Sequence, residues 1–179
     1  GNTDAAVAQY RAILETAQND TYRGQVEFKI GQALFDAGRL DEAYEQFNVV
    51  FMNYPANYEA YSSLVALRDA EYPLDPYQRG LVNYLQGLYE NAPAYFLDYI
   101  GRAGLEYPPD AHLYLGVSYR EIGNYAAAIT EFQAMINRFD PEDGEVWGQA
   151  WLEMAETYAE SGDSENAFAT YDRFVEEYS

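Results

Sequence analysis

The sequence predicts an all-α fold, an αα-hairpin solenoid of about four repeats plus one extra helix. Two observations support this prediction. One pattern of small residues, glycines and aromatic residues recurs four times, and apolar residues follow helical spacing between the glycines. Of the 179 residues, 49% are apolar, which is enough to build a packed core.

Each copy of the pattern has a small residue, a Gly seven positions later, an Ala five positions after that, and an aromatic residue four positions further on. In that order, the copies are Gly31, Gly38, Ala43 and Phe47; Gly80, Gly87, Ala92 and Phe96; Gly116, Gly123, Ala128 and Phe132; and Ala155, Gly162, Ala167 and Tyr171. The small residue lets two helices approach closely, and the Gly can adopt the left-handed conformation that ends the first helix. The Ala lies at the tightest crossing of the hairpin, with the aromatic residue one turn along the same face.

The intervals between the four repeat glycines are 49, 36 and 39 residues, and the longest leaves room for an extra helix. Asp75–Pro76 and Asp140–Pro141 each predict a helix start, with Asp as N-cap and Pro in the first turn. We expect one helical-repeat domain over 1–179. Its parts are a half repeat at about 4–19, a repeat at 21–55, an extra helix at 56–71, and repeats at 75–107, 109–140 and 143–179.

The half repeat is predicted because Ala6, Tyr10 and Ile13 match a second helix that has no first helix before it. Solenoids need polar capping repeats, and the pattern offers none at either end. We therefore expect the chain to be part of a longer protein.

Three stretches carry a family resemblance: Leu115–Gly116 with Tyr119, Trp151 with Tyr158, and Ile30–Gly31 with Pro55. They resemble the tetratricopeptide repeat, whose unit is W-x2-L-G-x2-Y followed by Ala, an aromatic residue and Pro. The resemblance implies a right-handed superhelix in which first helices line the concave face. The units here are longer than the 34 residues typical of that family.

The order of the predicted elements carries a second, more specific resemblance. The segment Tyr77–Tyr89 follows a lone helix, and Trp151-Leu-Glu-Met-Ala-Glu stands near the end. This order is similar to that of the helical N-terminal region of bacterial soluble lytic transglycosylases, which cleave peptidoglycan strands. This resemblance implies a bacterial extracytoplasmic location, in the periplasm or cell envelope. The catalytic signature of that family, a Glu-Ser pair followed by Gly-Leu-Met-Gln, is missing, so only the scaffold is carried over.

The charge of the chain limits its partners. Ten Lys and Arg residues face 30 Asp and Glu residues, for a formal charge of −20. This argues against nucleic acids, which need basic patches, and against anionic membrane surfaces. No apolar run approaches the roughly 20 residues of a membrane span. A neutral or basic partner fits better, and the acidic residues also have a simpler role on a solvated outer face.

Catalytic and metal-binding patterns are weak. The chain has no Cys, one His (His112) and one Lys (Lys29), which argues against thiol chemistry, nucleophile triads and phosphate loops. Glu142, Asp143 and Glu145 cluster where a helix is expected to start, so they favour helix capping over a cation site. We predict a chain that is not an enzyme, with no cofactor and no metal.

The aligned first helices predict a concave groove rich in aromatic and amide side chains, which suit extended peptides and sugars. Some of these rings are also expected to pack between helices. The predicted groove residues are Gln25, Phe28, Gln32, Phe35, Tyr77, Leu81, Tyr84, Leu113, Val117, Arg120, Gln149, Leu152 and Glu156. The sequence predicts a scaffold that binds a peptide or protein segment. The alternatives are the structural arm of a lytic transglycosylase, shaping a groove for a peptidoglycan strand, and a scaffold lipoprotein for envelope assembly.

Overall fold

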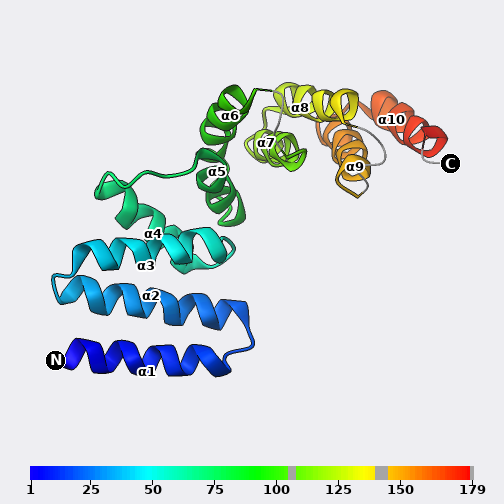
Figure 1. Ribbon diagram of the computed structural model, residues 1–179. Coiled ribbons are helices and arrows are strands. Elements are labelled where there is room, and N and C mark those ends of the chain that lie inside the picture. Colours follow the sequence, from blue (N-terminus) through cyan, green and yellow to red (C-terminus); the bar gives the residue numbers. More distant parts are fainter. Residues whose placement is uncertain (105–107, 140–144, 178–179) are drawn as a thin grey trace. The chain divides into compact units, whose positions relative to one another are not determined.

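The computed structural model describes residues 1–104, 108–139 and 145–177, and these residues form α helices and turns without a strand (Figure 1). The all-α prediction is confirmed. The chain divides into two compact units, Gly1–Gly87 and Leu88–Ser179. The first holds α1 (Asn2–Thr16), α2 (Asp20–Asp36), α3 (Leu40–Asn53), α4 (Tyr58–Asp69) and α5 (Pro76–Leu85). The second holds α6 (Ala92–Ala103), α7 (Asp110–Glu121), α8 (Tyr125–Arg138), α9 (Glu145–Glu160) and α10 (Ser164–Glu177).

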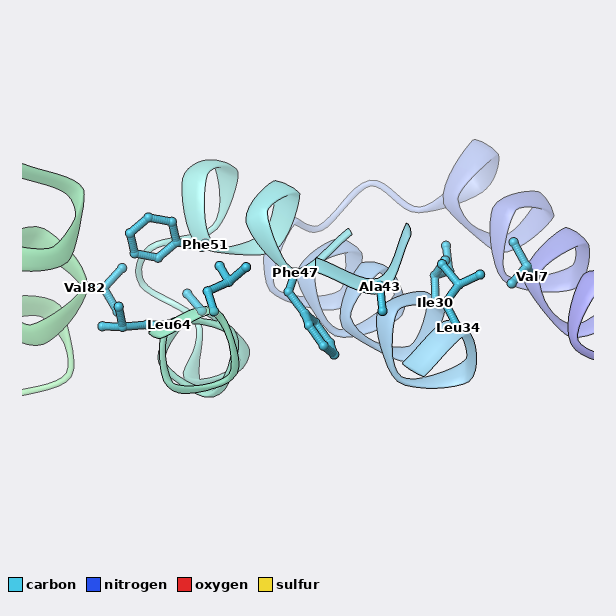
Figure 2. Close-up of a cluster of buried hydrophobic side chains, with 10 residues drawn as sticks. Val7, Ile30, Leu34, Ala43, Phe47, Phe51, Leu64 and Val82 are labelled. Atoms are coloured by element: carbon cyan, nitrogen blue, oxygen red, sulfur yellow. The ribbon is translucent and has the colours of Figure 1, made fainter. Parts of the chain in front are cut away.

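In the first unit, α1, α2 and α3 run antiparallel to their neighbours in the chain, and α4 packs against both α2 and α3 (Figure 1). A core of buried side chains extends from Val7 on α1, through α2, α3 and α4, to Val82 on α5 (Figure 2). Phe51, Leu64 and Val82 lie together at one end of it (Figure 2). Each helix therefore buries its apolar side against neighbours in the chain, as a solenoid requires.

The repeat glycines end helices as the pattern predicts. Gly38, Gly87, Gly123 and Gly162 have φ angles of 74°, 70°, 77° and 88°, in the left-handed region that favours Gly. At the first of these turns, the N–H of Arg39 donates to the carbonyl oxygen of Leu34 at 3.0 Å. This bond pairs one of the carbonyls that a helix end leaves without a partner.

The small residues bring the two helices of a hairpin close together. A Cβ atom added at Gly31 would lie 2.6 Å from Cε1 of Phe47, and one added at Gly116 would lie 2.5 Å from Cε1 of Phe132. Both distances are shorter than real Cβ contacts. The predicted small-residue and aromatic contacts are therefore present in α2/α3 and in α7/α8.

Helix starts also follow the sequence. Asp75 caps α5 by accepting a hydrogen bond from the N–H of Gln78 at 2.8 Å, and Pro76 opens the helix. The side-chain amide of Gln78 then donates to the carbonyl oxygen of Phe51 at 2.7 Å, which ties α5 to the end of α3. The predicted start at Asp140–Pro141 lies outside the described residues.

In the second unit, α9 supplies the largest buried side chains. Trp147 and Trp151 lie one turn apart, with ring centroids 5.8 Å apart at 67°. The indole N–H of Trp147 donates to the carbonyl oxygen of Ile136 at 3.3 Å, joining α9 to α8. The predicted repeat at 75–107 falls partly in each unit, because α5 belongs to the first and α6 to the second. The pairing of these two helices stays a prediction.

Candidate functional site

Three of the predicted groove residues line one hollow in the first unit. Phe28, Gln32 and Phe35 lie on α2 at helical spacing, so their side chains share a face. They line a hollow of about 310 Å³ together with Asp36, Phe47 and Ala66. Because α2, α3 and α4 each contribute to its wall, the hollow depends on the packing of the first hairpin against the extra helix.

The wall of this hollow is a set of interlocked rings. The ring of Phe47 lies 5.3 Å from that of Phe28 and 6.5 Å from that of Phe35, centroid to centroid. Phe35 also meets Tyr44 edge to face at 6.3 Å. Phe47 is fixed by its contact with Gly31, whereas Phe35 remains 45% exposed. The rings are therefore held in place while one of them offers surface to a ligand.

Two polar groups accompany the rings. The side-chain oxygen of Gln32 accepts a hydrogen bond from the ammonium group of Lys29 at 3.1 Å. The exposed Asp36 adds a carboxylate to the lining. Gln25, two turns before Gln32 on the same helix, is exposed but does not line the hollow. The hollow thus combines aromatic surface with one negative charge.

The remaining predicted positions of the first unit lie on α5. Tyr77, Leu81 and Tyr84 are half-buried and do not line the hollow. Part of each of these three side chains is therefore accessible to solvent on α5. Whether they bind a ligand stays a prediction.

In the second unit, the predicted groove positions separate into two groups. Leu113 and Val117 on α7 are buried and present almost no side-chain surface, because α7 is packed within the unit. Gln149, Leu152 and Glu156 on α9 are exposed. Only the second group could meet a partner directly.

Arg120 connects these two helices through carboxylates. Its Nη1 lies 2.6 Å from Oε2 of Glu153 and 3.3 Å from Oε2 of Glu156, with Glu121 and Glu160 also within 4 Å. Burial works against the charge of Arg120, but the surrounding carboxylates, Glu153 foremost, raise the guanidinium pKa above its ordinary value. Arg120 is therefore committed to the contact between α7 and α9, and the surface around it is acidic.

The sequence did not reveal two features of the site region. His112 is buried, and its Nδ1 lies 2.7 Å from Oε2 of Glu131 on α8, a residue 19 positions away. A second hollow of about 430 Å³ lies among α1, α2 and α3, next to an ion pair in which Arg39 Nη1 meets Oδ1 of Asp4 at 2.7 Å. The sequence pattern predicts neither pair, because the repeat assigns no role to these four positions.

Among the described residues, no three His, Asp or Glu side chains are grouped as they would be around a metal ion. Nor does any helix among them combine the length and the apolar character needed to cross a membrane. Glu142 and Asp143 lie outside the described residues.

Comparison with known proteins finds a repeat family that matches part of the chain and solved structures with a similar fold. The tetratricopeptide repeat family model matches residues 110–140 and 149–179, which correspond to α7/α8 and α9/α10. The crystal structure of MamA is similar over 99% of this chain and 90% of its own, with 19% identity and a TM-score of 0.50. BtubC (BKLC) from P. vanneervenii is similar over 98% of this chain and 73% of its own, with 16% identity and a TM-score of 0.48. A search of curated proteins found no match.

Because the sequence identity is this low, the structural similarity supports only the fold. None of these comparisons supports the narrower resemblance to lytic transglycosylases, so that resemblance and the extracytoplasmic location stay predictions. The chain is therefore a tetratricopeptide-like helical-repeat solenoid that contains two segments matching the tetratricopeptide repeat family.

Proposed function

We propose that this chain is a non-catalytic scaffold that binds a short segment of a partner protein, with the hollow between α2, α3 and α4 as its anchor point. The observation that carries the proposal is the exposed ring of Phe35 beside the rings of Phe28 and Phe47 in a hollow of about 310 Å³. That volume is at the small end of ligand sites, so it suits one or two side chains rather than a folded domain.

The chemistry of the lining indicates which side chains fit. Aromatic walls favour an apolar or aromatic side chain, and also the aliphatic stem of Lys or Arg. Asp36 lies in the same lining, so a cationic group could sit over the rings and near a carboxylate at once. We therefore expect an apolar anchor residue with Lys or Arg beside it.

The charge of the chain supports the same choice. A formal charge of −20 attracts basic segments and repels acidic ones. Because such steering is screened by salt, binding should weaken as ionic strength rises. A partner bound through apolar contacts alone would show little of this dependence.

The test is selection of peptides from a random phage-displayed library on the immobilised chain, followed by fluorescence polarisation of the selected peptides. We expect enrichment of an apolar residue next to Lys or Arg. Phe35→Ala should weaken binding at least about tenfold, as expected when an aromatic anchor is truncated.

The matched control is Tyr22→Ala, because Tyr22 lies on the same helix, is 48% exposed, and does not line the hollow. This variant should bind as the wild type does. Equal binding of the selected peptides to the Phe35→Ala variant would refute the proposed site. If purified peptidoglycan strands bind in a Phe35-dependent way and no peptide does, the glycan-binding alternative is correct instead.

A further inference from the structure

Three aromatic rings line the hollow between α2, α3 and α4. The ring of Phe47 neighbours both of the others, and its plane is tilted by 39° from that of Phe28 and by 45° from that of Phe35. The face of an aromatic ring is negative and attracts a cation within about 6 Å of its centroid. Because neighbouring centroids are only 5.3 and 6.5 Å apart, a group seated in the hollow lies within reach of more than one ring.

A carboxylate accompanies these rings. Asp36 follows Phe35 directly in the chain, lines the same hollow and is exposed. Among the described residues, no ion pair or hydrogen bond engages this carboxylate. Asp36 is also the last residue of α2, where a negative charge opposes the helix dipole. Stabilisation of the helix therefore does not account for Asp36, and its charge is available to a cation that enters the hollow.

The hollow offers few hydrogen-bond acceptors to such a cation. Apart from Asp36, its only polar side chain is that of Gln32, whose oxygen already accepts a hydrogen bond from Lys29 at 3.1 Å. A primary ammonium carries three N–H groups, and removing them from water without acceptors costs free energy. A fully methylated ammonium has no N–H group, keeps its positive charge and adds apolar surface. The lining therefore suits a quaternary ammonium better than the head group of unmodified Lys.

We propose that this hollow binds the trimethylated lysine side chain of a partner protein, with the quaternary ammonium against the rings and near the carboxylate of Asp36. The inference rests on the proposed function, because it names the chemistry of the anchor side chain in the same site. A volume of about 310 Å³ suits one such side chain, and the aliphatic stem of the lysine carries the charge from the partner's backbone to the rings. The formal charge of −20 adds attraction at longer range.

The test compares three short peptides that differ at one position. That position holds trimethyllysine, unmodified Lys, or a neutral isostere of trimethyllysine in which carbon replaces the ammonium nitrogen. Each peptide is titrated into the isotopically labelled chain, and amide NMR signals report both affinity and location. The trimethyllysine peptide should bind at least about threefold tighter than either of the others and shift the signals of Phe35, Asp36 and Ala66. Equal affinity for the neutral isostere would overturn the proposal, since the contact would then be apolar only.

Two substitutions test the ring and the carboxylate separately. Phe35→Leu keeps an apolar side chain but removes the ring, so the trimethyllysine peptide should lose at least about threefold in affinity and the neutral peptide should lose less. Asp36→Asn should weaken the trimethyllysine peptide and leave the neutral peptide unchanged. Both positions are exposed, so circular dichroism should show that the variants fold. Equal losses for the two peptides in the Phe35→Leu variant would overturn the proposal.

The matched control for the carboxylate is Asp41→Asn. Asp41 is exposed on α3 and does not line the hollow, and its substitution changes the charge by the same amount. This variant should bind the trimethyllysine peptide as the wild type does. Equal losses in Asp36→Asn and Asp41→Asn would overturn the proposal, since they would indicate general attraction to an acidic protein.

The library peptides separate a failure of this inference from a failure of the site. If they bind in a Phe35-dependent way while trimethyllysine gains nothing over its neutral isostere, the peptide site stands and the ligand chemistry inferred for it is wrong. If neither the library peptides nor the trimethyllysine peptide shift the signals of the lining, both proposals fail. If free tetramethylammonium binds in the hollow but the trimethyllysine peptide does not, the ligand is a small free cation, which overturns the choice of a partner side chain.

Discussion

Substituting Gly116 by Ala tests the close approach of α7 and α8. The added Cβ would lie 2.5 Å from Cε1 of Phe132 and 2.8 Å from Cδ1 and Cζ of the same ring. Ordinary contacts begin at about 3.4 Å, so the ring would have to move by roughly an ångström. Phe132 is fully buried and has little room to do so. Overpacking of this kind costs about 1–3 kcal/mol.

The helix preference of Ala works in the opposite direction. Ala is favoured over Gly inside a helix by about 1 kcal/mol, which offsets part of the clash. Gly101→Ala isolates this second effect, because Gly101 lies in α6 and a Cβ there would meet nothing within 4 Å. We expect Gly101→Ala to stabilise the second unit. The Gly116→Ala variant should be about 1–3 kcal/mol less stable than the Gly101→Ala variant, because it carries the cost of the clash in addition.

Tryptophan fluorescence during urea unfolding is the assay. The two Trp residues of the chain, Trp147 and Trp151, both lie on α9, so their emission reports on the second unit. Far-UV circular dichroism in the same titration reports on the helices of both units. The double variant Gly116→Ala, Phe132→Leu should be more stable than the sum of its single changes, by about 0.5–3 kcal/mol, because the smaller side chain leaves room for the Cβ. If Gly116→Ala stabilises as much as Gly101→Ala does, the reasoning about the repeat register is wrong.

Three further predictions use the same measurements. Ala128→Leu should destabilise the second unit by about 1–3 kcal/mol in urea unfolding, because Ala128 is fully buried at the hairpin crossing, and an unchanged midpoint would contradict this. Gly38→Ala should cost about 1–2 kcal/mol by circular dichroism, because Gly38 has a φ angle of 74°, and a gain in stability would refute it. Hydrogen bonds from the side chain and backbone N–H of Asn166 hold the pKa of Asp163 below its ordinary 3.8. The stability difference between wild type and Asp163→Ala should therefore stay constant from about pH 8 to about pH 5, and shrink only as the pH falls toward that lowered pKa.

The parts of the fold that the sequence predicts are those fixed by local chemistry. A left-handed turn favours Gly, so Gly123 and Gly162 could be recognised as helix ends from the sequence. The N-cap at Asp75 is recognisable because Pro76 follows it. The contact between Gly116 and Phe132 follows from a fixed spacing within one hairpin. Each of these features depends on residues within about 20 positions of one another.

The parts that could not be predicted depend on the neighbouring hairpin. Leu113 and Val117 occupy helical positions that the repeat pattern assigns to the groove, yet packing within the second unit buries them. Arg120 was predicted to line the groove, but carboxylates from α9, 33 to 40 residues later in the chain, surround its guanidinium group. The sequence predicted Phe28, Gln32 and Phe35 as groove residues, but it did not predict that Ala66 of the extra helix lines the same hollow. The sequence contains the residues but not the angle at which successive hairpins pack.

The order of contacts along the chain has a consequence for how the protein forms. In the described residues, every pair of helices in contact consists of neighbours in the chain or of helices separated by a single helix, such as α2 with α4 and α7 with α9. Proteins dominated by such short-range contacts close small loops and fold quickly. Each hairpin can therefore gain its native contacts as soon as the next helix leaves the ribosome, and synthesis can proceed with little apolar surface left waiting for a distant segment.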